Sequence, residues 1–326
     1  MTSENSEKIV TLIGGSGFIG RHIVRALAKR GYRVRVACRR PDLAGHVQPL
    51  GTPGQVMPVQ ANVRYPASLA AACGAAHAVI NLTGVLFSSG AQSFDAIHVF
   101  GAEASAKAAK AAKAKVFIQM SALGADANST SKYARSKAAG EAKAKATFPG
   151  AIILRPSIVF GPEDNFFNQF AGLSRLAPAL PLIGGGHTKF TPLFVGDLAE
   201  AIATLVDRGE ASGQTLELGG PEVFTFKQLI EFTLATIGRK RLLVPVPWII
   251  AKIMGTVMGY LPGAPLTADQ VKLLKTDNVV SEAATREGRD LASLGITGQS
   301  IQGIVPSYLY RYRKAGQFTA PKGMPE

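Results

Sequence analysis

The 326-residue sequence is poor in cysteine, in charged residues and in long apolar runs. Its two cysteines, Cys38 and Cys73, are too few for a disulfide-stapled secreted scaffold and fit a reducing compartment. The five histidines are scattered without ligand spacing, so we expect no metal site. No window of about 18 residues is apolar and free of charge, and the first residues resemble neither a signal peptide nor an Arg-rich transit segment. We therefore expect no membrane-spanning segment.

The length and the charge balance indicate a globular, basic protein. At about 150 residues per domain, 326 residues suggest about two folding units. The 36 Lys and Arg outnumber the 22 Asp and Glu, which gives a net charge of +14, and 47% of the residues are hydrophobic. The 35 glycines and 19 prolines follow no period, which excludes a collagen-like chain.

Short β-rich runs alternate with helical runs in the first half of the sequence. The expected strands are Ile9–Ile13, Arg33–Cys38, Val56–Val59, Ala78–Leu82, Val116–Met120 and Ile152–Leu154. The expected helices are Phe18–Arg30, Ser93–Lys113 and Ser131–Ala146. Such alternation is typical of βαβ units with right-handed crossovers. It predicts an α/β fold with a doubly wound, Rossmann-type parallel sheet.

After about residue 160 the pattern becomes irregular. We expect Leu193–Val195 and Leu216–Leu218 to be further strands of the same sheet. Thr225, with Gln228 three positions later, forms a capping box, which predicts a helix ending near Gly238. The expected domains are a Rossmann domain over residues 1–224, of which 160–192 contribute to the second lobe, and a smaller C-terminal lobe over residues 225–326.

A glycine-rich turn follows the first expected strand and opens the first helix, with the spacing Gly-x-x-Gly-x-x-Gly. In a dinucleotide-binding βαβ unit the first glycine permits the tight turn, the second lets the backbone approach a pyrophosphate, and the third lets helix and sheet pack. The N–H groups at the helix N-terminus attract the phosphates. The alternative is a tight turn without a ligand. The residues predicted to hold the cofactor here are Gly14, Ser16, Gly17, Phe18, Ile19 and Gly20.

The second expected strand ends in two arginines. Arg39 lies where an acidic residue would bind the 2′-hydroxyl of an NAD ribose, and no acid occurs before Asp42. Guanidinium groups suit a 2′-phosphate, so Arg39 and Arg40 favour NADPH over NADH. The alternative is a solvated basic loop, as the high net charge allows.

Ser121 follows the fifth expected strand, and Tyr133 and Lys137 lie four residues apart on the next helix. Residues at this spacing share a helical face, so both side chains can point into one pocket. A nearby ammonium lowers the cost of ionising a tyrosine, and Ser121 can hydrogen-bond a reacting oxygen. This predicts an acid/base site, with an ordinary exposed Tyr and Lys pair as the alternative.

Further motifs accompany these residues. They are Arg155–Pro162, Phe194–Ala199 and Leu218–Glu222, which with the glycine turn are distributed over most of residues 8–230. Together they resemble an extended or atypical short-chain dehydrogenase/reductase. The resemblance implies that Ser121, Tyr133 and Lys137 hold the catalytic positions. The sequence departs from this pattern at His98, in the region where extended reductases often have asparagine. It also implies cofactor contacts at Asn62, Val63, Leu82, Thr83, Gly84, Pro156, Ser157 and Ile158.

Tyr133–Glu141, Ile153–Asp164, Val244–Trp248 and Leu266–Val271 resemble more closely the NADPH-binding accessory subunits of respiratory complex I. This resemblance implies a structural NADPH that is bound without turnover and a role in assembly or stability of the peripheral arm. It implies other complex I subunits as partners, at the cytoplasmic side of the inner membrane (the matrix side in a mitochondrion). The alternative is an active NADPH-dependent reductase or epimerase-type enzyme that uses Tyr133, Lys137 and Ser121.

The expected C-terminal lobe is both basic and apolar. Pro247–Leu261 is strongly apolar, includes Trp248 and Tyr260, and is interrupted only by Lys252. Such a stretch can lie on anionic lipid headgroups, dock on a partner subunit, or pack over a substrate cleft, and the apolar run alone does not separate these. Tyr308–Lys314 interleaves aromatic and basic residues, but no nucleic-acid-binding motif accompanies it, so we expect no nucleic acid partner.

Overall fold

The computed structural model describes residues 5–209, 213–259, 266–314 and 316–318, and it divides into two compact units that interleave along the chain. The first unit comprises Met1–Pro156, Gly196–Leu218 and Glu282–Ile296, and the second comprises Ser157–Val195, Gly219–Ser281 and Thr297–Glu326. This differs from the expected division at residue 224. The backbone N–H of Glu217 donates to the carbonyl of Arg289, and Nη1 of Arg289 donates to the carbonyl of Thr215, which ties a late segment to a strand of the first unit.

The first unit is built on a seven-stranded sheet in which all neighbouring strands pair in parallel, with the order β11-β6-β5-β4-β1-β2-β3. Its strands are β1 (Ile9–Ile13), β2 (Arg33–Cys38), β3 (Val56–Gln60), β4 (Ala78–Asn81), β5 (Val116–Met120), β6 (Ile152–Pro156) and β11 (Thr215–Leu218). Its helices are α1 (Phe18–Lys29), α2 (Pro66–Cys73), α3 (Phe100–Ala111), α4 (Lys132–Thr147), α6 (Val195–Arg208) and α10 (Glu282–Arg286). The order confirms the expected doubly wound Rossmann-type sheet.

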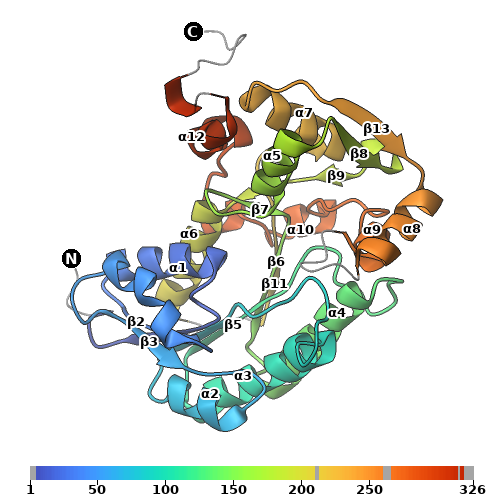
Figure 1. Cartoon of the computed structure of the whole chain (residues 1–326). Coiled ribbons are helices and arrows are strands. Elements are labelled where there is room, and N and C mark those ends of the chain that lie inside the picture. Colours follow the sequence, from blue (N-terminus) through green and yellow to red (C-terminus); the bar gives the residue numbers. More distant parts are fainter. Residues whose placement is uncertain (1–4, 210–212, 260–265, 315, 319–326) are drawn as a thin grey trace. The chain divides into compact units, whose positions relative to one another are not determined.

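Helices cover both faces of this sheet, with α1 and α6 on one face and α2, α3 and α4 on the other (Figure 1). All five side chains of β5 are buried, which explains why this strand is mostly apolar. The alanines of α3 let this helix pack closely onto the sheet, where Ala104, Ala106 and Ala108 join Phe117 in the core. The expected helix Ser93–Lys113 is divided, since Asp95–Val99 forms a π-helical turn before α3.

The second unit has short strand pairs around an aromatic core. Its strands are β7 (Val159–Phe160), β8 (Ala179–Ile183), β9 (Lys189–Phe190), β10 (Leu193–Phe194), β12 (Phe224–Thr225) and β13 (Leu242–Val246). Its helices are α5 (Phe166–Leu176), α7 (Phe226–Thr236), α8 (Trp248–Met258), α9 (Ala268–Leu273), α11 (Ile301–Ile304) and α12 (Pro306–Leu309). Buried rings of Phe160, Phe167, Phe190 and Phe226 form the centre of this core. The capping box predicted at Thr225 is present and begins α7.

One predicted strand does not join the main sheet. Leu193–Phe194 forms β10, which pairs with β7 in a separate two-stranded sheet of the second unit, whereas Thr215–Leu218 is the seventh strand of the main sheet as expected. The cause is a hydrogen bond from the Leu193 N–H to the Ile158 carbonyl, which lies beyond the end of β6. The prediction for Leu193–Val195 was therefore wrong.

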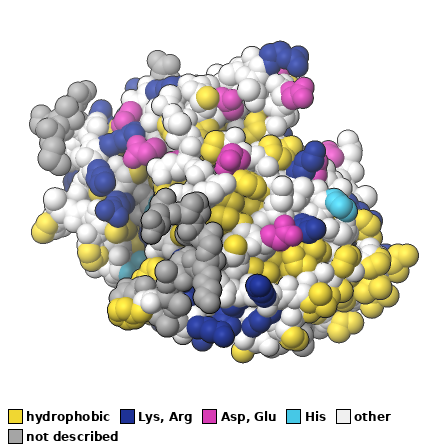
Figure 2. Space-filling view, turned by 90° about the horizontal axis from the view of Figure 1, so that it is seen from above, with side chains coloured by type: hydrophobic (Ala, Val, Ile, Leu, Met, Phe, Trp, Pro, Cys, Tyr) yellow, Lys and Arg dark blue, Asp and Glu magenta, His cyan; other side chains and the backbone are white. Residues whose placement is uncertain are grey.

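An apolar surface is exposed on α8. Ile249, Ile250, Ile253 and Val257 are between 51% and 76% exposed. Hydrophobic side chains gather at the right edge of the view in Figure 2, on the side where Figure 1 shows α8. Tyr260 and Leu261, which belong to the same apolar run, lie outside the described residues. In the part of the chain that the structure describes, each helix is too short or too polar to cross a bilayer.

Candidate functional site

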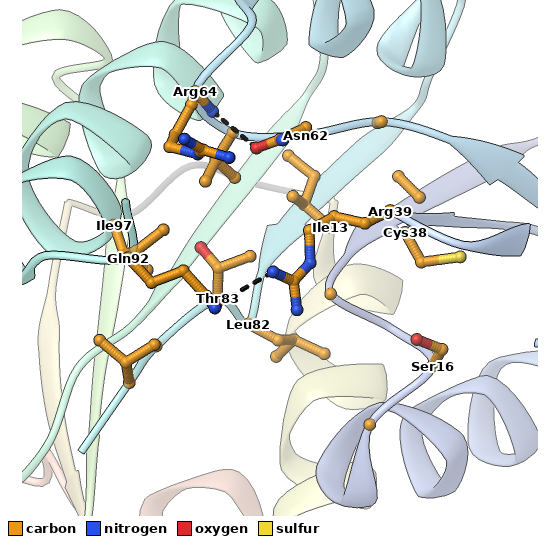
Figure 3. Close-up of a pocket in the computed structure, with 17 residues that line it drawn as sticks. Ile13, Ser16, Cys38, Arg39, Asn62, Arg64, Leu82, Thr83, Gln92 and Ile97 are labelled. Atoms are coloured by element: carbon orange, nitrogen blue, oxygen red, sulfur yellow. Dashed lines mark hydrogen bonds between the residues drawn. The ribbon is translucent and has the colours of Figure 1, made fainter. Parts of the chain in front are cut away.

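The first unit has a cavity of about 350 Å³ at the carboxyl ends of its strands (Figure 3). It lies where the strand order reverses, between β1 and β4, which is the usual ligand position in an open α/β sheet. Its size is within the range of small-molecule sites. The lining residues are Ile13, Gly14, Ser16, Gly17, Ala37, Cys38, Arg39, Ala61, Asn62, Val63, Arg64, Leu82, Thr83, Gly84, Val85, Gln92 and Ile97.

The glycine turn has the geometry that the spacing predicts. Gly14 has φ +82°, in the region that favours glycine, and its N–H donates to the Ala37 carbonyl at 2.8 Å. A Cβ on Gly20 would lie 2.3 Å from the Gly15 carbonyl oxygen, so this position requires glycine for helix packing. A Cβ on Gly17 would meet only the Gly14 oxygen at 3.7 Å, so the space beside it is open to a ligand.

The start of α1 offers backbone donors to that open space. Gly17 is the N-cap and provides no side-chain cap, so the N–H groups of the first turn are left for an anion. Phe18 and Ile19 form this turn and are not among the lining residues. The lining residues of the turn are Gly14, Ser16 and Gly17, so a pyrophosphate would lie against these three.

Only one of the two predicted arginines lines the cavity. Arg39 extends over it, and its Nη1 donates to Oε1 of Gln92 at 3.0 Å (Figure 3). Arg40 instead pairs with Asp42 through three contacts of 2.7 to 3.2 Å and is not among the lining residues. The sequence interpretation missed Arg64, a second lining guanidinium that directly follows the predicted Asn62 and Val63.

The cofactor contacts implied by family resemblance are divided between the two units. Asn62, Val63, Leu82, Thr83 and Gly84 all line the cavity. Pro156 ends β6 in the first unit and is not a lining residue, while Ser157 and Ile158 belong to the second unit. There Ser157 Oγ donates to Asn278 Oδ1 at 2.7 Å.

Tyr133 and Lys137 share one face of α4, which Ser131 caps at its N-terminus. Nζ of Lys137 lies 5.7 Å from the centroid of the Tyr133 ring and donates to the Met120 carbonyl at 3.4 Å. Burial lowers the pKa of Lys137 to about 8, against the opposing effect of Glu141, and burial raises the pKa of Tyr133 to about 12. Each shift favours the neutral form of its group.

The Lys137 ammonium also reaches the wall of the cavity. A Cβ on Gly84, which lines the cavity, would lie 3.2 Å from Nζ of Lys137. This places the amine next to a predicted cofactor contact.

Ser121 is engaged in a buried polar network. Its hydroxyl donates to Oε1 of Glu141, and Arg155 holds the same carboxylate with bonds of 2.9 and 2.7 Å. The Ser121 proton is therefore directed to a carboxylate in this structure. The sequence interpretation missed Glu141, although it lies four residues beyond Lys137 and so on the same helical face.

The model of the NAD dependent epimerase/dehydratase family matches residues 10–219, and the chain belongs to this family. The fold and the cavity fit a nicotinamide dinucleotide. Among the described residues, no group of three or more His, Cys, Asp or Glu side chains could hold a metal ion.

Within and around this family, three comparisons stand out. The chain is 36% identical to the Arabidopsis thaliana mitochondrial NADH dehydrogenase [ubiquinone] 1 alpha subcomplex subunit 9, over 94% of this chain and 79% of that protein. It is 37% identical to a Caulobacter vibrioides ceramide reductase over 54% of each chain. The solved NADPH-dependent quinone oxidoreductase QOR2 of Escherichia coli, in complex with NADPH, has the same fold, with a TM-score of 0.71, 19% identity, and coverage of 92% of this chain and 99% of that one.

Proposed function

We propose that this chain is an NADPH-binding accessory subunit of respiratory complex I that holds its cofactor without turning it over. The observation that carries the proposal is the 36% sequence identity to alpha subcomplex subunit 9. This similarity extends over 94% of the chain, so it includes the second unit as well as the cofactor-binding unit. A ligand present at a thousand times its dissociation constant adds about 4 kcal/mol to fold stability, so a cofactor can serve a purely structural role.

Affinity-tagged full-length chain tests the proposal in its native host. The chain is expected to co-purify with the complete complex I and to carry NADPH at equal stoichiometry. Deletion is expected to lower the amount of assembled complex on a native gel, and the wild-type gene is expected to restore it. A tagged chain that elutes alone while complex I assembles normally without it contradicts the proposal.

The preference for NADPH rests on the two guanidinium groups that line the cavity. Arg39 and Arg64 both line the cavity, so each is a candidate partner of a 2′-phosphate, and the cavity lining contains no Asp or Glu to bind a 2′-hydroxyl. A charge-assisted hydrogen bond contributes about 1.5–3 kcal/mol, so Arg39→Ser is expected to weaken NADPH binding by about tenfold or more. NADH binding should change little.

Arg40 provides a matched control for the cofactor assignment. It is exposed and already paired with Asp42, so Arg40→Ser should leave both affinities within about twofold. Calorimetry with both nucleotides measures the difference. Equal losses for NADPH and NADH in Arg39→Ser, or a selective loss of NADPH in Arg40→Ser, would remove this assignment.

The second candidate function is an NADPH-dependent reductase. It is favoured by the position of Lys137 beside Tyr133 and the cavity wall, and by similarity to a ceramide reductase over 54% of each chain. The engagement of Ser121 by Glu141 favours binding without turnover. Tyr133→Phe separates the two functions. If the chain is an enzyme, this variant should lose turnover of a long-chain carbonyl substrate and keep NADPH binding. If the chain is an accessory subunit, the variant should assemble into complex I as the wild type does.

The second unit attaches the subunit near the membrane. The exposed apolar face of α8 and the basic Lys252 within it suit a membrane surface with anionic headgroups. The chain then lies peripherally, on the cytoplasmic side of the inner membrane or its mitochondrial equivalent, the matrix side. Flotation with anionic vesicles is expected to retain the wild-type chain more strongly than flotation with neutral vesicles. Equal retention by both would oppose the lipid contact.

A further inference from the structure

His98 is a buried histidine whose two ring nitrogens both have partners. It is 3% exposed and lies in the π-helical turn Asp95–Val99. The N–H of Val85, a cavity-lining residue, donates to Nε2 at 3.0 Å. Nδ1 lies 2.8 Å from Oγ of Ser136, and that hydroxyl donates to the Tyr133 carbonyl at 2.7 Å. The imidazole therefore connects the cavity wall to the first turns of α4.

These contacts define the protonation state of the ring. Nε2 accepts a hydrogen bond from a backbone N–H, so it carries no proton. The Ser136 proton points to the Tyr133 carbonyl, so the Ser136 oxygen accepts from Nδ1–H. The imidazole is neutral, in agreement with its burial and the nearby Lys137 charge, which lower the pKa of His98 to about 3.

The surrounding backbone leaves little room for another arrangement. A Cβ on Gly140 would lie 2.2 Å from the His98 carbonyl oxygen, so α4 and the π-helical turn meet at a glycine. The ring stacks on Phe94 with centroids 5.4 Å apart and contacts Tyr133 edge to face at the same separation. The ring is therefore fixed by packing as well as by hydrogen bonds.

We propose that His98 is a positioning residue of the dinucleotide site: it holds Val85 and Ser136 at the same time and so sets the distance between the cavity wall and the Tyr133–Lys137 face of α4. The proposal rests on the proposed function, because its effect is on dinucleotide binding.

Two substitutions separate positioning from packing. His98→Phe keeps a ring against Phe94 and Tyr133 but removes both nitrogens, and it is expected to weaken NADPH binding by about tenfold or more. His98→Gln can still accept from the Val85 N–H and donate to Ser136, and it should bind within about threefold of wild type. The matched control is His77→Phe, since His77 stacks on Tyr32 and does not line the cavity.

The titration midpoint of the Lys137 amine provides a measurement that general destabilisation of the fold does not change. The groups facing its amine are Tyr133 and Glu141 from α4, His98 from the π-helical turn, and the Met120 carbonyl from β5. If His98→Phe separates α4 from the cavity wall, water reaches the amine and its titration midpoint rises from about 8 toward the ordinary lysine value. NMR of the lysine Cε in the full-length protein without nucleotide measures that midpoint.

The outcomes are distinct. Weaker binding and a raised midpoint in His98→Phe, with both restored in His98→Gln, support the proposal. Unchanged binding in His98→Phe, or equal losses in both variants with an unchanged midpoint, overturn it. If His98→Phe does not fold, Ser136→Ala removes one of the two connections, and wild-type affinity and midpoint in that variant overturn it as well. A wild-type chain that binds no NADPH, but whose Lys137 midpoint still depends on His98, contradicts the proposed function and not the positioning.

Discussion

The two units of this chain differ in how they build a core and in what they leave exposed. The first packs small and aliphatic side chains around a seven-stranded parallel sheet and contains the dinucleotide cavity. The second packs phenylalanines between short strand pairs and exposes the apolar face of α8. The regular βαβ frame of the first unit fixes the backbone of the turn Gly14–Gly20. The short strand pairs of the second unit place fewer constraints on its surface residues. The proposed function assigns cofactor binding to the first unit and attachment to partners to the second.

Truncating one large core ring in each unit is expected to have the largest effect. Phe117 and Phe167 are both fully buried, the first in the alanine-rich core and the second among the phenylalanines. Each change to alanine should lower the free energy of unfolding of its own unit by about 3–5 kcal/mol. Calorimetric melting measures the two transitions, and saturating NADPH should raise only that of the first unit.

NADPH affinity provides the control for this pair. Phe167→Ala should leave the dissociation constant within about twofold of wild type, since the cavity lining lies in the first unit. If both variants lower one shared transition by the same amount, the units fold as a single cooperative structure and the comparison between them fails.

Acid should act on the two units in opposite directions through their buried groups. In the first unit the folded pKa of His98 is about 3, below the ordinary value of 6.5, so the unfolded chain binds more protons between these values. Stability from this group is complete above pH 6.5 and is lost as the pH falls, by about 3 kcal/mol between pH 6.5 and pH 4. His98→Gln should remove that loss, as denaturant unfolding at several pH values will test.

Asp164 gives the opposite sign in the second unit. Its carboxylate accepts from the Tyr308 hydroxyl at 2.6 Å, and burial raises its pKa above the ordinary value of 3.8. The folded state therefore binds more protons, and the contribution of this group to stability falls as the pH rises through the folded pKa. Asp164→Asn should flatten this trend. If the stability of the second unit in Asp164→Asn changes with pH as steeply as in the wild type, the burial of Asp164 has no such effect.

The sequence predicted the first unit far better than the second, for physical reasons. Strands such as Arg33–Cys38 and Val116–Met120 were predicted with their observed bounds because βαβ alternation and the glycine turn are local patterns. The β8–β13 pair joins residues about sixty positions apart with no periodic signal, so it was missed, and Leu193–Val195 was given to the wrong sheet. Long-range pairing is not encoded in local composition.

The same reasoning explains the site. Arg39 and the glycines follow from their position after a strand, whereas the pairing of Arg40 with Asp42 depends on side-chain geometry that spacing does not specify. Arg64 and Glu141 were missed although each adjoins a predicted residue. Their roles follow from which neighbours lie beside them in space, and only the structure shows that Glu141 contacts both Ser121 and Arg155.

A buried and an exposed ion pair extend the comparison to charge. Glu141 holds Arg155 inside the first unit, whereas Glu231 lies 3.7 Å from Lys227 on the surface of the second, with both side chains at least half exposed. Glu141→Gln leaves a partly buried guanidinium poorly paired and should cost about 2 kcal/mol. Glu231→Gln should cost less than about 0.5 kcal/mol, because water screens exposed pairs. Urea unfolding measures the loss of stability in each variant. Equal losses in Glu141→Gln and Glu231→Gln would show that the buried pair contributes no more than the exposed one.

The smallest effect on stability, and the most selective effect on function, is expected on α8. Ile253 is 60% exposed, so Ile253→Asn should change the free energy of unfolding by less than about 0.5 kcal/mol. If the exposed face of α8 contacts a partner or lipid, the same change should reduce recovery of the chain with complex I while NADPH affinity stays at the wild-type value. Ala251, which is fully buried on the same helix, gives the reverse control, since Ala251→Asn should destabilise the second unit. Full recovery of Ile253→Asn with the complex would show that attachment uses another surface.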